Sequence, residues 1–272
     1  MLLVVGILIG LVLGLTGAGG SVLAVPLLLF LLHLEPTDAT GLALGVVAVS
    51  SVYGAVQRIL HREVLWIPAL LFGVSGALLA PWGRWFATLL PASLLLTGFA
   101  LLSLVIAVRM LYQSVRRPEL ARVVRAGDSL AEPPEPLLCK LSETGRFDWR
   151  PRCMAGLTGG GMMTGLLSGL FGVGGGFLIV PFLNQLNGVS MRHAVATSLI
   201  IIAAISSSGF FAHIAVHTIN WGQLGLLAVG GIVGMIAGSM VVRYLAGAHL
   251  QRVFAIAIIV MAVLVLWRSL QI

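Results

Sequence analysis

The segment Gly172-Val173-Gly174-Gly175-Gly176, with Pro181 after it, interrupts the middle of a long apolar stretch. A similar segment, Gly17-Ala18-Gly19-Gly20-Ser21 with Pro26 after it, interrupts a second apolar stretch near the start of the chain. A glycine inside a helix costs about 1 kcal/mol and a proline about 3 kcal/mol. We therefore predict that each stretch forms two half-helices joined by irregular backbone.

The two glycine segments belong to a tandem repeat of the whole chain. Pro26 and Pro181 are 155 positions apart (181 − 26), and both halves match at that offset without a gap. The matches include the less common residues Trp66 with Trp221 and Phe99 with Phe254, and several glycines, among them Gly54 with Gly209 and Gly83 with Gly238. Such repeats are common in secondary transporters. We divide the chain into a first transmembrane repeat (1–112), a linker (113–150) and a second transmembrane repeat (151–272).

The composition is that of an integral membrane protein. Hydrophobic residues make up 59 % of the chain, the mean hydropathy is +1.08, and only 9 % of residues are charged. A soluble domain carries about 25 % charged residues. A spanning helix needs about 20 apolar residues, and six further segments approach this length: 39–57, 64–83, 91–112, 194–212, 219–242 and 249–270. We predict an all-α, polytopic transmembrane bundle. Residues 1–20 resemble a signal-peptide core, but their equivalent recurs in mid-chain, so we expect them in the mature fold.

Charged residues are concentrated around the linker. Nine of the sixteen basic residues and six of the nine acidic ones lie between Arg109 and Arg152. We interpret this as positive-inside anchoring. Nucleic-acid binding is not expected, because no aromatic residues are interleaved with a basic patch. The prolines within the stretch predict a flexible, soluble connector.

The arginines outside the linker also indicate how the repeats are oriented. If each broken segment turns back instead of crossing the membrane, five arginines share the side of the linker: Arg58, Arg62, Arg192, Arg243 and Arg252. Only Arg84 and Arg268 then lie on the opposite side, together with Glu35 and Asp38. If each segment crosses, the division obeys the positive-inside rule less well. We favour inverted repeats with a cytoplasmic linker and both termini outside, in a bacterial inner membrane.

The glycine segments are the candidate substrate site. Glycine exposes backbone N–H groups and lets a ligand approach closely, and a helix that starts just after such a turn points its positive dipole end at it. Inverted repeats would bring the two turns towards each other near the membrane midplane. Helix packing is the alternative reading, and we prefer it for the GxxxG pairs Gly10/Gly14, Gly165/Gly169 and Gly234/Gly238. A nucleotide loop is excluded, because no lysine follows the glycines.

The glycine turn that ends in Ile179-Val180-Pro181, followed by Ala194 and by Ala196-Thr197-Ser198-Leu199, resembles the TauE/SafE sulfite exporter family, also described as 4-toluene sulfonate uptake permeases. The resemblance spans both halves. It implies transport of sulfur-containing or other organic anions such as sulfite, sulfonates or sulfoacetate. The first half departs from the motif, with Leu42-Ala43 in place of Thr197-Ser198, so a symmetric pair of polar sites is not expected.

The apolar segments independently favour an anion. No acidic residue lies inside them, whereas a cation site or a carboxylate proton relay would normally place one there. Hydroxyl and backbone N–H groups suit the oxygens of sulfite or a sulfonate, although any one hydroxyl can instead bond to its own helix. We assign substrate binding to Gly17, Gly19, Gly20, Ser21, Gly172, Gly174, Gly175, Gly176, Thr197 and Ser198.

The resulting hypothesis is a secondary transporter that works by alternating access. A passive anion channel is the alternative. An intramembrane protease is less favoured, because Ser168 lacks the GxSG spacing, and we expect neither enzymatic activity nor a cofactor or metal. His213 and His217 are read as interfacial residues in preference to zinc ligands, and a proton-coupling role for His213 or His193 is the less favoured option. The expected partners are the anion and membrane lipid; proton or sodium coupling and homo-oligomers stay open.

Two cysteines lie in or beside the linker. Cys139 and Cys153 have neither CxxC spacing nor a pair of histidines nearby. We therefore expect both cysteines to be reduced thiols, in preference to a disulfide or a zinc site.

Overall fold

The computed structural model describes residues 1–17, 20–116, 151–176, 179, 191–241 and 247–269. These residues form helices and no strand, which confirms the predicted all-α bundle. The helices are α1 (Leu2–Thr16), α2 (Gly20–Leu31), α3 (Pro36–Leu60), α4 (Trp66–Leu89), α5 (Ala92–Arg116), α7 (Pro151–Phe171), α9 (Met191–Ile214), α10 (Trp221–Val241) and α11 (Gly247–Ser269). The prediction of a flexible linker concerns residues 117–150, which lie outside this described part.

Helices α1 and α7 stop where the sequence predicted a break. Gly17 follows α1 with φ +68°, and its N–H donates to the Leu13 carbonyl at 2.7 Å. Gly172 follows α7 with φ +72°, and its N–H donates to the Ser168 carbonyl at 2.8 Å. Glycine adopts this left-handed conformation without the penalty of a Cβ atom, so it is the usual residue just past a helix end.

The chain reverses direction after each break. A Cβ atom on Gly20 would lie 2.7 Å from Cα of Leu13, although seven residues of continuous helix would separate them by about 10 Å. A Cβ atom on Gly175 would likewise lie 2.6 Å from Cγ2 of Thr164 on α7. Helices α1 and α2 have 15 and 12 residues, or about 22 and 18 Å. Each is too short to cross a hydrocarbon core of about 30 Å, so the pair is a hairpin of half-helices.

The helices of the two halves start at equivalent positions. Pro36, Trp66 and Ala92 begin α3, α4 and α5, and the residues 155 positions later, Met191, Trp221 and Gly247, begin α9, α10 and α11. The main helix pairs repeat in the same way, because α1 packs on α10 and its counterpart α7 packs on α4. The first helix of each half thus packs on the helix of the other half that begins at Trp66 or Trp221.

Glycines bring the backbones of these crossed pairs into contact. A Cβ atom on Gly10 of α1 would overlap the carbonyl oxygen of Gly231 on α10. At the equivalent place, a Cβ atom on Gly165 of α7 would overlap the carbonyl oxygen of Gly76 on α4. Small residues allow such close approach between membrane helices. The packing interpretation of the GxxxG pairs is therefore confirmed.

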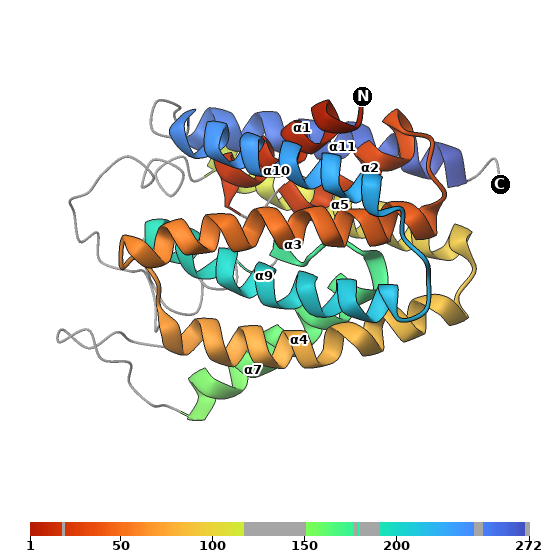
Figure 1. Ribbon diagram of the computed structural model, residues 1–272. Coiled ribbons are helices and arrows are strands. Elements are labelled where there is room, and N and C mark those ends of the chain that lie inside the picture. The colour runs from red at the N-terminus through yellow and green to blue at the C-terminus, as the bar shows by residue number, and fades with distance from the viewer. Residues whose placement is uncertain (18–19, 117–150, 177–178, 180–190, 242–246, 270–272) are drawn as a thin grey trace.

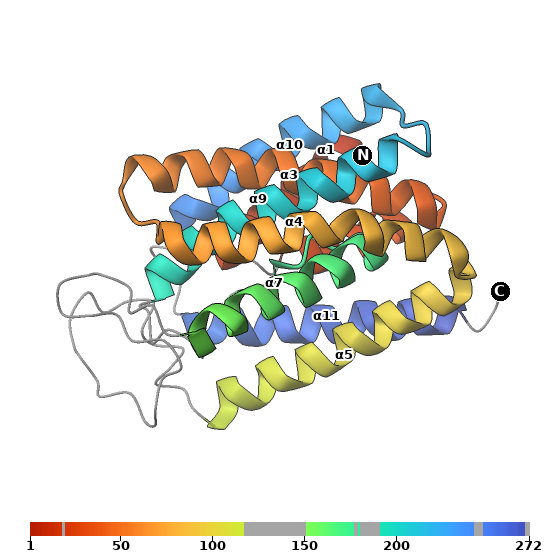
Figure 2. The same ribbon diagram turned by 90° about the horizontal axis from the view of Figure 1, so that it is seen from below.

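Two helices at equivalent positions of the repeat, α3 and α9, run in opposite directions. Figures 1 and 2 show α3 and α9 side by side and antiparallel, and α11 ends at one end of the bundle, with the N-terminus in the half nearest that end. The end of α5 and the start of α7, which flank the linker, lie at the opposite end (Figure 2). Inverted repeats predict this relation between equivalent helices.

Within the described part of the chain, four helices are long and apolar enough to cross a membrane: Pro36–Leu60, Trp66–Leu89, His193–Ile214 and Trp221–Val241. Their outer faces are apolar: Leu70, Val74 and Leu78, which follow one another at every fourth residue of α4, are all more than half exposed. Such a stripe suits contact with lipid acyl chains. Trp66 and Trp221, both exposed, begin equivalent helices, where interfacial tryptophans are common.

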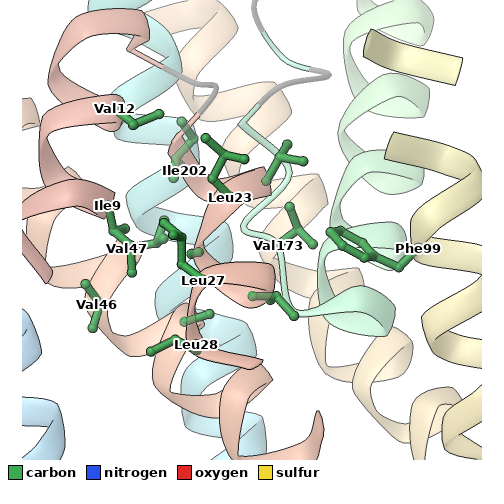
Figure 3. Close-up of a cluster of buried hydrophobic side chains, with 14 of the residues drawn as sticks. Ile9, Val12, Leu23, Leu27, Leu28, Val46, Val47, Phe99, Val173 and Ile202 are labelled. Carbon is green, nitrogen blue, oxygen red and sulfur yellow. The ribbon is translucent and has the colours of Figure 1, made fainter. Parts of the chain in front are cut away.

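The interior of the bundle is an apolar core that includes the second glycine turn. Figure 3 shows Val173 of that turn between Leu23 of α2 and Phe99 of α5. Val173 is 2 % exposed, so the turn is buried between the two halves. One sequence expectation fails near the linker: Cys153, buried at the start of α7, is disulfide-bonded and is not a reduced thiol.

Candidate functional site

The two predicted glycine segments meet at Gly174. A Cβ atom on Gly174 would lie 2.6 Å from Oγ of Ser206 on α9 and 3.5 Å from Cβ of Ser21 on α2. Ser21 is fully buried, as is Ser206. Ser21 stands in the first turn of α2, so the positive end of that helix dipole lies beside the second glycine turn. We call Gly174, Ser21 and Ser206 the central site.

Gly174 and Gly175 both need the conformational freedom of glycine. Their φ angles are +69° and +66°, in the left-handed region that other residues rarely adopt. Gly176, the next residue, is buried and is again in helical conformation. Gly20 packs on α1 and Gly175 on α7, so both support the reversals. Gly19 lies outside the described residues.

Thr197 and Ser198 occupy separate places near the start of α9. The Thr197 hydroxyl accepts a hydrogen bond from the backbone N–H of Leu65, just before α4, at 3.1 Å. The Ser198 hydroxyl contacts the Val195 carbonyl at 2.8 Å and the Gly17 carbonyl at 3.2 Å. Ser198 therefore holds the first glycine turn, whereas Thr197 holds the entry to α4. Neither is brought to Gly174.

Thr197→Val should lower the stability of the protein. The change leaves the partly buried Leu65 N–H without its acceptor, and the loss of such a hydrogen bond costs about 0.5–1.5 kcal/mol. Thr197→Ser keeps an acceptor and should stay within a few degrees of wild type. Thermal unfolding in detergent measures both. Equal unfolding temperatures for wild type and Thr197→Val would show that this hydrogen bond does not hold α4.

Ser198, Ser206 and His213 form a buried polar file along α9. Ser206 lies eight positions after Ser198, and His213 lies seven positions after Ser206. These spacings correspond to about 12 and 10 Å along the helix axis and place the three side chains on one face of the helix. All three are 0 % exposed. Neither the Ser206 hydroxyl nor either ring nitrogen of His213 has a hydrogen-bond partner in the described part of the chain. This spacing was available in the sequence, but we had read His213 as interfacial.

His213 stacks on His217, with ring centroids 4.9 Å apart and an interplanar angle of 13°. Within the described residues no group of three or more His, Cys, Asp or Glu side chains could hold a metal ion. His217 extends the row of polar side chains on α9 towards the end of the bundle opposite the linker.

Sequence reasoning also missed the role of Arg84. We had placed it at the membrane surface opposite the linker, but its side chain is only 5 % exposed within α4. One guanidinium nitrogen donates to the Thr40 hydroxyl of α3 at 3.2 Å. A lone arginine at the end of an otherwise apolar stretch was the available signal, but only the packing of neighbouring helices shows that it is buried.

Comparison with known proteins identifies the family. The family model described as "Sulfite exporter TauE/SafE" matches residues 2–265. The chain belongs to the TauE/SafE sulfite exporter family. A "Probable membrane transporter protein" of Xylella fastidiosa (strain Temecula1) is 30 % identical over 267 residues, which cover 97 % of this chain and 93 % of that protein.

More distant TauE/SafE relatives carry similar names. A "Probable membrane transporter protein YunE" of Bacillus subtilis is 25 % identical over 232 residues, covering 81 % of this chain and 80 % of that protein. Another from the same species, YdhB, is 24 % identical over 243 residues, 88 % of each chain. No solved structure matches. The chain is thus a membrane transporter of this family, and not an enzyme.

Proposed function

We propose that this TauE/SafE protein is a secondary transporter that moves a small sulfur-containing anion, such as sulfite or a sulfonate, by alternating access. The observation that carries the proposal is the central site, where the Ser206 hydroxyl is buried beside Gly174 and has no hydrogen-bond partner among the described residues. A buried hydroxyl without a partner is costly. A bound oxyanion would accept its hydrogen bond.

The charges inside the bundle favour an anion over a cation. The buried polar and charged residues of the described part are serines, threonines, Arg84 and His213, with no carboxylate among them. A cation site in a membrane protein would normally include an acidic side chain. Backbone N–H groups at the start of α2 and along the second turn would add donors of the kind that bind oxyanions.

Alternating access would use the crossed pairing of the two halves. The pairs α1/α10 and α4/α7 are held by backbone contacts at glycines, so each is suited to move as a unit. Helices α3 and α9 lie between them and carry Val47 and Ser206, which border Gly174. Rocking one pair against the other about an inverted-repeat axis would expose the central site to each side in turn.

The membrane potential would favour export. An inside-negative potential contributes about 2.3 kcal/mol per charge and per 100 mV to moving an anion out of the cell. Export therefore requires no coupling ion, whereas uptake would require protons or sodium. Strictly sodium-dependent uptake would contradict the proposed direction.

Counterflow in liposomes separates a transporter from a channel. Vesicles loaded with unlabelled sulfite and diluted into a trace of labelled sulfite should accumulate label transiently, because a transporter exchanges bound substrate. External sulfite should saturate the rate. A channel would give no overshoot and a rate that rises linearly with concentration, so that outcome would replace the transporter reading.

We further propose a cytoplasmic linker in a bacterial inner membrane, on the grounds of the arginine distribution. The disulfide at Cys153 argues the other way, because structural disulfides are rare in the cytosol. Lys140, in the linker, is the only lysine of the chain. A membrane-impermeant amine reagent should label Lys140 in open vesicles but not in intact cells, with the labelled peptide identified by mass spectrometry because the N-terminal amine is expected outside. Labelling of Lys140 in intact cells would reverse the orientation.

A further inference from the structure

Within the described residues, Arg84 is a buried positive charge without a carboxylate partner. Its side chain is 5 % exposed and donates to the neutral hydroxyl of Thr40, and among these residues its Nε atom has no hydrogen-bond partner. The recorded ion pair of the described residues, Arg58 with Glu63, lies at the other end of α3. An uncompensated charge inside a membrane protein is costly and normally finds a partner.

Three further elements meet at this arginine. Thr40 is followed by Gly41, where a Cβ atom would overlap the imidazole ring of His213, so successive residues of α3 contact Arg84 and His213. Arg84 also lies within electrostatic reach of His213. Gly172 packs on Thr40, because a Cβ atom there would lie 2.5 Å from Cβ of Thr40. The second glycine turn thus starts beside the guanidinium.

We propose that Arg84, Thr40 and His213 form an anion subsite at the end of the bundle opposite the linker, where a small oxyanion binds before or after it occupies the central site. The proposal rests on the anion transport proposed above and adds the residue that supplies the counter-charge. The planar guanidinium matches the geometry of sulfite, sulfate and sulfonate oxygens. The unpaired ring nitrogens of His213 provide a neutral donor for the same ligand.

The subsite exists in one half only. The residues 155 positions from Arg84 and Thr40 are Ser239 and Val195, which carry no charge. The counterpart of His213 is Arg58, whose NH1 atom contacts Glu63 at 2.7 Å. Gly17 packs on Val195 as Gly172 packs on Thr40. The contact between the glycine turn and the neighbouring helix is therefore repeated in both halves, whereas the positive charge of Arg84 is not. The fold alone therefore does not require an arginine at this place.

The competing explanation is that Arg84 only stabilises the end of α7. Gly169, in the last turn of α7, packs on the backbone of Arg84, and a cation near a helix C-terminus is favourable by about 0.3–1 kcal/mol. That role leaves the unpaired nitrogens of His213 unexplained. It also predicts a loss of stability without any loss of anion affinity.

Two measurements on purified full-length protein test the subsite. Thermal unfolding with increasing sulfite or sulfate, at constant ionic strength, should show anion-dependent stabilisation of wild type that Arg84→Gln loses. In liposomes, Arg84→Gln should raise the KM for sulfite at least tenfold, and Arg84→Lys should retain part of the affinity. The matched control Arg58→Gln should leave both quantities at their wild-type values.

The outcomes separate the two proposals. Wild-type sulfite transport with an unchanged KM in Arg84→Gln would overturn the subsite and leave the proposed function standing. No anion transport by wild type would refute the proposed function, and the thermal titration would still decide whether Arg84 binds an anion. Equal anion stabilisation of wild type and Arg84→Gln would refute the subsite. If Arg84→Gln does not fold, anion-dependent stabilisation and the KM for sulfite are compared between wild type and the variants Arg84→Lys and His213→Phe.

Discussion

Gly174→Val is expected to reduce anion transport at least tenfold in protein that still folds. Its φ of +69° is strained for any residue with a Cβ atom, and a branched side chain would overlap Oγ of Ser206 and press on Cγ1 of Val47. Such backbone strain costs about 1–3 kcal/mol, which lowers stability without removing a helix. The change would fill the central site. Liposome flux and thermal unfolding measure the two effects.

Two variants show whether the loss comes from the central site. Gly225→Val places the same side chain on α10 at a glycine with nothing within 4 Å of the added Cβ atom, so transport should be unchanged. Ser206→Ala removes a buried hydroxyl that has no partner to lose, so it should lower anion affinity without lowering stability. Normal transport by Gly174→Val and Ser206→Ala would place the substrate elsewhere.

Gly165→Leu should prevent stable packing of the two halves. The Cβ atom would overlap the backbone of Gly76, which cannot move without displacing α4. Overpacking costs about 1–3 kcal/mol even where side chains can adjust, and here the obstacle is main chain. We expect a fall of more than 10 °C in unfolding temperature, or aggregated protein in size-exclusion chromatography. Gly10→Leu, at the equivalent contact with Gly231, should have the same effect.

Gly159→Leu is the matched control for this packing prediction. Gly159 also lies in α7, but a Cβ atom there would have nothing within 4 Å. Its unfolding temperature should stay within a few degrees of wild type. If Gly159→Leu and Gly165→Leu are equally damaging, general loss of glycine rather than the contact with α4 would be responsible.

Local features of the chain were predictable from the sequence. The breaks at Gly17 and Gly172 follow from glycine conformational preferences, and the 155-residue offset predicts which helices start at equivalent positions. Hydropathy then sufficed to predict an all-helical membrane protein. These properties depend on residues close together in the chain, or on a pattern repeated along it.

The partners of individual polar side chains were not predictable. The motif drew attention to Thr197, but its hydroxyl binds the Leu65 N–H, a contact set by how α9 packs on α4. Arg84 and His213 looked peripheral because each lies near the end of an apolar segment. Only the helices around them make both buried. The sequence therefore singled out the glycines that we propose bind substrate, and missed the charge beside them.

Currents from proteoliposomes on a solid-supported membrane test anion transport through the central site most directly. Wild type should be challenged with sulfite, sulfate, sulfoacetate, taurine and thiosulfate, at two pH values, with and without sodium, beside Gly174→Val and Gly225→Val. We predict a saturable current for at least one sulfur anion that persists without sodium, is retained in Gly225→Val and is lost in Gly174→Val. A current that is the same in wild type and Gly174→Val, or no current for any anion from intact wild type, would contradict this account.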